Sequence, residues 1–288
     1  MIVRKLIMKT NYNGSTYNEV MPVYHTRFNY ETNVRIQTDS PLRSLTQRRR
    51  FWFGGRYATV VIDFELYPNF LRTLFYAIAS YTRQNDKLVF SLTNSNSIPI
   101  TNRTIFEFET FEGHKVQTNW GVLYELQLKL VADSFSKGSA KFVLLPNTNS
   151  ISSVADYTYE PQITPKDLTG LIVVGSNNRQ VAISSLKLSY QRKLEPKVSM
   201  YGYLEDMYTT EQAVEFDLNI LDSSLTNVND ILLTGTKAKL QVQIGNLYTL
   251  LIPEFVVKSV SEVYSSKIVS ISCSAVGDSY TQIQLNQL

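Results

Sequence analysis

The chain has 288 residues, of which 43% are hydrophobic and 18% charged, with twelve glycines and a single cysteine. This composition predicts a folded chain of one or two domains and excludes collagen-like, disulfide-stabilised and wholly disordered proteins. No apolar run approaches the roughly 18 residues that a membrane helix needs, and no secretory signal pattern follows Met1. We therefore expect no membrane association, and we expect the whole chain to be the mature protein in the compartment where it is made.

The formal net charge of +3 hides an uneven distribution along the chain. Residues 1–60 contain ten Lys and Arg against three acids, whereas residues 195–288 contain five Lys against eleven acids. Ends of opposite charge steer and orient association, so this pattern favours head-to-tail contacts or packing in a ring. A solvated surface with uneven charge is the alternative interpretation.

Alternation of apolar and polar residues, rich in β-branched and aromatic side chains, predicts a mainly β protein of sandwiches or barrels. The clearest strand is Ala58–Leu66, where Val60, Ile62, Phe64 and Leu66 share one face. The other predicted strands are Val34–Thr38, Lys87–Leu92, Thr104–Glu109, Leu123–Ala132, Ala140–Leu145, Leu171–Val174, Gln180–Tyr190, Lys197–Leu204, Val214–Ile220, Lys237–Ile244, Leu247–Phe255 and Lys267–Ala275. Between the strands ending at Ile244 and starting at Leu247, Gly245-Asn246 predicts a two-residue hairpin turn.

One segment has helical spacing. After Pro68, which suits a first helical turn, apolar residues recur every three or four positions from Phe70 to Ala79. We predict one amphipathic helix over residues 68–84, packed on a sheet because an isolated helix of this length is marginal in water.

Two β domains are predicted. The polar stretch from Arg192 to Pro196 contains a proline between two strands and marks the change in charge balance. We therefore expect an N-terminal β domain at 1–193, which carries the helix, and a C-terminal β domain at 194–288. The stretch Asn147–Gln162 is rich in Ser, Asn, Thr and Tyr, which indicates an exposed loop.

The chain contains few of the residue types that catalytic and metal sites need. His25 and His114 are the only histidines, Cys273 is the only cysteine, and no phosphate-binding glycine motif occurs. We predict no catalytic, metal-binding or cofactor-binding residues. Asp63 with Glu65 and Glu107 with Glu109 form two carboxylate pairs two residues apart, which is the spacing of the solvent-facing side of a strand. A glycosidase that uses such a pair for catalysis is the less favoured alternative.

The string Arg48-Arg-Arg-Phe-Trp-Phe-Gly-Gly-Arg-Tyr57 brackets three consecutive aromatic residues with four arginines. Arginines beside stacking rings suit single-stranded nucleic acid. Arg and Trp are also the favoured anchors of protein–protein interfaces, and this is the interpretation that we prefer. The predicted interface residues are Arg48, Arg49, Arg50, Trp52 and Arg56.

The element order from Leu45 to Thr93 resembles a known family. In sequence come an Arg/aromatic strand (Arg50–Phe53), a second strand (Val60–Leu66), Pro68, a helix (Phe70–Tyr81) and an apolar strand (Leu88–Leu92). This order is similar to that of the N-terminal domain of distal tail and baseplate-hub proteins of tailed bacteriophages. The resemblance covers about a sixth of the chain. It implies a tail-tube-like core, with one helix on a β-sandwich, that assembles into rings.

The resemblance implies a structural virion protein of a phage tail or baseplate, of the distal tail or tube-adaptor type, made in the host cytoplasm. Its partners would be copies of itself and neighbouring tail proteins, and DNA would pass through the ring lumen without tight binding. No enzymatic activity is expected. A carbohydrate- or surface-binding β module is the main alternative, in which Tyr157 and Tyr159 would stack on sugar.

Overall fold

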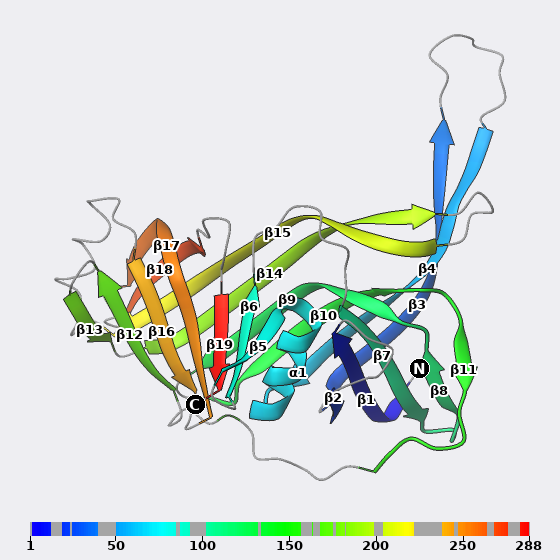
Figure 1. Cartoon of the computed structure of the whole chain (residues 1–288), viewed down its shortest axis with the longest axis horizontal. Coiled ribbons are helices and arrows are strands. Elements are labelled where there is room, and N and C mark those ends of the chain that lie inside the picture. The colour runs from blue at the N-terminus through cyan, green and yellow to red at the C-terminus, as the bar shows by residue number, and fades with distance from the viewer. Residues whose placement is uncertain are drawn as a thin grey trace.

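The computed structural model describes residues 2–12, 19–23, 25–39, 50–84, 87–92, 102–131, 134–156, 163, 168–174, 177–181, 183–198, 204–221, 238–244, 247–263, 268–275 and 283–287. The fold is mainly β, with two antiparallel sheets and one helix in this part of the chain, as the alternation predicts (Figure 1).

The larger sheet is curled like half a barrel (Figure 1). Its main run of neighbouring strands is β3 (His25–Asp39), β4 (Arg50–Glu65), β10 (Lys137–Leu144), β9 (Gly121–Val131), β14 (Ile183–Val198), β15 (Leu204–Leu221), β18 (Ile268–Ala275) and β17 (Tyr248–Val263). From β17 the sheet continues on two sides, through β16 (Ala238–Ile244), β12 (Leu168–Val174) and β13 (Asn177–Val181), and through β19 (Ile283–Gln287), β6 (Lys87–Leu92) and β5 (Ser80–Gln84).

The smaller sheet is built around the N-terminal strand. Its neighbouring strands are β2 (Glu19–Pro22), β1 (Val3–Tyr12), β7 (Asn102–Thr110), β8 (Lys115–Thr118) and β11 (Thr148–Ser150). A single residue pair, Thr104 with Gly121, joins this sheet to the larger one.

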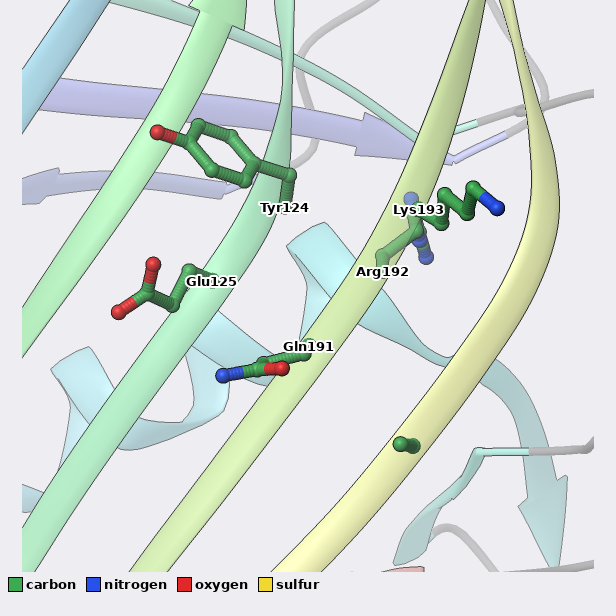
Figure 2. A pocket seen from close by; sticks show the side chains of 6 residues that line it. Tyr124, Glu125, Gln191, Arg192 and Lys193 are labelled. Atoms are coloured by element: carbon green, nitrogen blue, oxygen red, sulfur yellow. The ribbon is translucent and has the colours of Figure 1, made fainter.

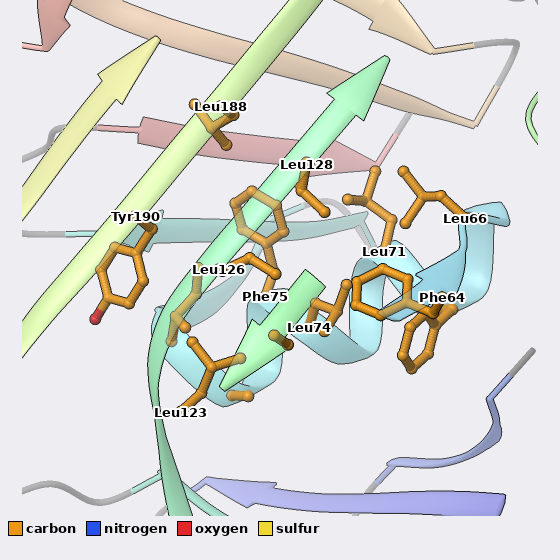
Figure 3. Packing of buried hydrophobic residues seen from close by; sticks show 14 of the residues in the cluster. Phe64, Leu66, Leu71, Leu74, Phe75, Leu123, Leu126, Leu128, Leu188 and Tyr190 are labelled. Carbon is orange, nitrogen blue, oxygen red and sulfur yellow. The ribbon is translucent and has the colours of Figure 1, made fainter. Parts of the chain in front are cut away.

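The helix α1 (Pro68–Ile78) is buried between the two sheets. It packs against β1, β2 and β7 on one side and against β9 and β6 on the other. Figure 3 shows Leu71, Leu74 and Phe75 of the helix among Leu123, Leu126 and Leu128 of β9 and Leu188 and Tyr190 of β14. The predicted helix with Pro68 in its first turn and its apolar stripe on a sheet is therefore confirmed.

The helix ends at Ile78, six residues before the predicted end at Gln84. Two side chains from distant strands bind its last carbonyl groups. Asn102 Nδ2 donates to Tyr76 O (2.5 Å) and Ala79 O (3.0 Å), and Arg192 Nη2 donates to Ile78 O (3.1 Å). These donors satisfy carbonyls that the helix leaves unpaired, and the guanidinium charge suits the negative end of the helix dipole. Residues 80–84 instead form β5, paired with β6.

Three strand predictions differ from the structure. The segment Lys197–Leu204 is not one strand, because β14 ends at Val198 and β15 begins at Leu204. Gln180–Tyr190 is divided between β13 and β14. The strands on either side of Gly245-Asn246 pair antiparallel, but Ile244 pairs with Tyr248, so Leu247 precedes the second strand and its N–H donates to Ile244 O (3.4 Å). Gly245 and Asn246 lie outside the described residues.

Strand pairing continues across the predicted domain boundary at residue 194, with a register shift between Lys193 and Leu194. β14 runs through it from Ile183 to Val198, and β19 near the C-terminus pairs with β6. One cluster of buried side chains contains residues from both sides of the boundary, such as Leu74 and Leu250. Independent folding of 1–193 and 194–288 stays a prediction.

Candidate interaction surface

A two-stranded arm extends from the larger sheet (Figure 1). β10 pairs with β4 only as far as Ala58, whereas β3 continues to pair with β4 up to the pair Asp39 and Arg50. Residues 33–39 of β3 and 50–57 of β4 therefore pair with each other beyond the end of β10. We call this ribbon the arm.

A β-bulge lies within the arm. Val34 pairs with Arg56 and Ile36 pairs with Phe53, so Arg35 is opposite the Gly54-Gly55 dipeptide. A bulge bends the strand and increases its twist. Glycine is common at such irregularities because it lacks a side chain, and the bulge coincides with the Gly-Gly of the arginine–aromatic string.

The structure brings three of the five predicted interface residues into the arm. Arg50 and Trp52 belong to β4, opposite Asp39 and Gln37, and their side chains lie outside the described part of the chain. Arg56 is exposed. Arg48 and Arg49 lie outside the described residues, so their role stays a prediction.

A small apolar cluster lies at the foot of the arm, separate from the main core. Val122 is fully buried there, and Tyr57, Trp120, Val143, Leu145 and Leu194 pack partly buried against it. The guanidinium carbon of Arg103 lies 4.2 Å from the centre of the Trp120 ring, which is a cation–π contact. Sequence reasoning missed this cluster because its members come from four distant segments.

A hollow opens beside this cluster, where β14 leaves β9. Glu125 pairs with Lys141 and Leu123 pairs with Phe142, so Tyr124 is the extra residue of a bulge on β9. Pairing between β9 and β14 stops at Glu125 and Gln191. The hollow between the two strands has a volume of about 420 Å³. It is lined by Tyr124, Glu125, Gln191, Arg192, Lys193 and Ala213 (Figure 2).

Hydrogen bonds fix the charged side chains in and beside this hollow. Lys141 Nζ donates to Glu125 Oε2 (2.8 Å), and this hydrogen bond raises the pKa of Lys141, so its ammonium group keeps its charge at neutral pH. Arg192 is buried, and its Nε donates to Tyr190 Oη (2.6 Å). Burial raises the pKa of Tyr190, so its hydroxyl keeps its proton and donates to Gln212 Oε1 (3.0 Å).

The carboxylate pairs of the glycosidase alternative are placed on strands. Glu107 is buried and accepts hydrogen bonds from Lys9 Nζ (2.6 Å) and Gln117 Nε2 (2.8 Å). Glu109 lies 3.9 Å from Arg4 Nη1. Asp63 and Glu65 belong to β4. Partnered carboxylates of this kind stabilise the pairing of β1 with β7, and the absence of catalysis stays a prediction.

The other candidate residues of the sequence are dispersed. Both ring nitrogens of His25 lie near backbone carbonyl oxygens, Val23 O (3.3 Å) and Val3 O (3.2 Å), and His114 is exposed. Among the residues that the structure describes, no group of three or more His, Cys, Asp and Glu side chains could hold a metal ion. Tyr157 and Tyr159 of the carbohydrate-binding alternative lie outside these residues.

No family model matches the chain, and no curated protein matches it either. Within the described ranges, no helix has the length and apolar character needed to span a lipid bilayer.

Proposed function

We propose that the chain is a structural subunit of a bacteriophage tail or baseplate and that its copies form a ring. The mainly β fold, with one helix buried between two sheets, agrees with the tail-tube-like core that the family resemblance implies. In this proposal the partners are copies of the chain and neighbouring tail proteins, the location is the virion, and DNA passes through the ring without tight binding.

The observation that carries the proposal is the arm. A two-stranded ribbon alone in water is marginally stable, and its unpaired edges are templates for pairing with another chain. Beyond residue 57 toward its tip, no third strand among the described residues pairs with the arm, although β15 contacts β4. A neighbouring subunit that covers the ribbon would supply the missing contacts, and repetition of one such contact around an axis closes a ring.

Two neighbouring features extend this surface. Arg56 is exposed in the arm itself. At its foot, the apolar cluster around Val122 and the hollow between β9 and β14 offer an aromatic and apolar patch next to charged groups. Aromatic side chains and arginine are enriched at the centres of protein interfaces.

The test is the molar mass of the purified full chain, measured by size-exclusion chromatography with light scattering. We expect an oligomer for the wild type and a monomer for the triple variant R48E/R49E/R50E, because the change removes the arginine anchors of the proposed contact and reverses their charge. The matched control is R83E/K115E/K239E, which makes the same change of charge on β5, β8 and β16 and should remain an oligomer.

An intact oligomer in R48E/R49E/R50E would remove the interface role of the arginines. A wild-type chain that stays monomeric at high concentration, alone and with the products of neighbouring genes, would contradict the proposed ring.

A further inference from the structure

Three lysines lie directly opposite one another on three neighbouring strands, well away from the arm. Lys137 of β10 pairs with Lys129 of β9, and Lys129 pairs in turn with Lys187 of β14. All three side chains are exposed. Neighbouring strands are about 4.8 Å apart, so this lysine row spans roughly 10 Å across the sheet.

The lysine row carries charge that the described part of the chain does not neutralise. Like charges directly opposite each other destabilise a sheet. Other lysines on these sheets have partners, such as Lys141 with Glu125 (2.8 Å) and Lys9 with Glu107 (2.6 Å). Among the described residues, none of the three ammonium groups of the row forms an ion pair. A bound anion would therefore offset a real electrostatic cost.

The row borders a hollow of about 230 Å³ on the same face. Beside the lysines, the polar side chains that line it include Thr26, Gln127 and Ser139. Thr26 Oγ1 already donates to Asp63 O (3.3 Å) and Gln127 Nε2 donates one N–H to Glu125 (3.2 Å), so the lysine ammonium groups, the Ser139 hydroxyl and the second N–H of Gln127 are the donors for an anion. Charge-assisted bonds are the stronger ones. The lining of the hollow thus combines three lysines against one aspartate, hydrogen-bond donors and a concave shape.

Carboxylates limit the length of the anion that fits. Glu65 of β4 is opposite Lys137 at one end of the row, and Asp217 of β15 is opposite Lys187 at the other. Asp63 also lines the hollow. A phosphate backbone that continued past the three lysines would meet these acids, whereas two or three side-chain carboxylates fit between them.

We propose that the lysine row, Lys129, Lys137 and Lys187, binds a short acidic segment of another protein. This surface is separate from the arm, so the proposal does not depend on ring formation.

The experiment uses the full chain and a fluorescein-labelled hexaglutamate peptide, with binding followed by fluorescence anisotropy at about 50 mM salt, where surface charges are weakly screened. We expect saturable binding that K129Q/K137Q/K187Q weakens at least about tenfold, since complementary charges of both partners set the interaction. The control variant R83Q/K115Q/K239Q removes the same charge elsewhere and should bind as the wild type does. Near-UV circular dichroism verifies that each variant is folded.

Three results would overturn the proposal. The first is equal peptide binding by K129Q/K137Q/K187Q and the wild type. The second is tighter binding of a thymidine oligonucleotide with six phosphates, lost in the same variant, which would assign the row to nucleic acid. The third is a lower molar mass of this variant, which would make a second copy of the chain the occupant. None of these results bears on R48E/R49E/R50E, so the two proposals fail separately.

Discussion

The helix α1 and the arm differ in how much of the chain surrounds them. Eight of the eleven helix residues are buried, and side chains from β7 and β14 bind its last carbonyls. The arm consists of two strands that pair only with each other beyond Ala58. The buried helix is part of the main core, whereas the arm offers strand edges to a partner. Substitutions should therefore separate folding from association.

The largest effect is expected in the helix. Leu74 is fully buried, so Leu74→Ala leaves a cavity and should lower the free energy of unfolding by about 2–5 kcal/mol. Urea denaturation measures this loss. Leu247→Ala is the matched control, because Leu247 is 47% exposed and the same truncation there should change stability by less than about 0.5 kcal/mol. Equal losses at both positions would contradict the central role of the helix.

A second effect tests the packing of β4 against β10. A Cβ atom at Gly138 would lie 2.6 Å from the ring of Phe64 and 2.9 Å from Gln127 O. Gly138→Ala should therefore destabilise the chain by about 1–3 kcal/mol in thermal or urea unfolding. The double variant G138A/F64L, with a smaller side chain at 64, should be less destabilised than the two single losses combined. Simple additivity of the two losses would refute the contact.

The cap of the helix should have an intermediate effect. Asn102→Ala removes the donor to Tyr76 O and Ala79 O inside the core, which should cost about 1–2 kcal/mol of stability. Asn29→Ala serves as control, because Asn29 donates to Glu31 at the surface. Unfolding of both variants at the same urea concentration would contradict a stabilising role of the Asn102 cap.

The smallest effect has the opposite sign. Lys129 lies between Lys137 and Lys187, so Lys129→Gln removes two repulsive pairs and should raise stability by about 0.2–1 kcal/mol. The gain should shrink in high salt, because salt screens exposed charges. A loss of stability at low salt would show that the row is not repulsive in the free chain.

Local patterns predicted the elements whose faces differ in polarity. Val60, Ile62 and Phe64 alternate along β4 and are all buried, and the helix after Pro68 has its stripe in the core. β1 escaped prediction because Ile7 lies between Lys5 and Lys9 on the more polar face, so the buried Leu6, Ile7 and Met8 interrupt the alternation. The predicted helix end was wrong because Asn102 and Arg192, both distant in sequence, bind the last carbonyls, and because residues 80–84 pair with the following strand β6.

The surfaces could be predicted only in part. The arginine–aromatic string pointed to residues that the structure places in the arm, since unusual composition is visible in a sequence. The lysine row was not predicted, because each lysine is an ordinary wet-face residue of its own strand. Only the register between β10, β9 and β14 brings Lys137, Lys129 and Lys187 together.

Hydrogen exchange of the wild-type chain at increasing protein concentration tests the central claim most directly. If the arm is the contact between subunits, the amides of Ile36–Asp39 and Arg50–Phe53 should exchange rapidly in dilute solution and become protected as the oligomer forms. The amides of α1 should remain protected at every concentration. Exchange in the arm that does not depend on concentration, while the molar mass rises, would contradict the account.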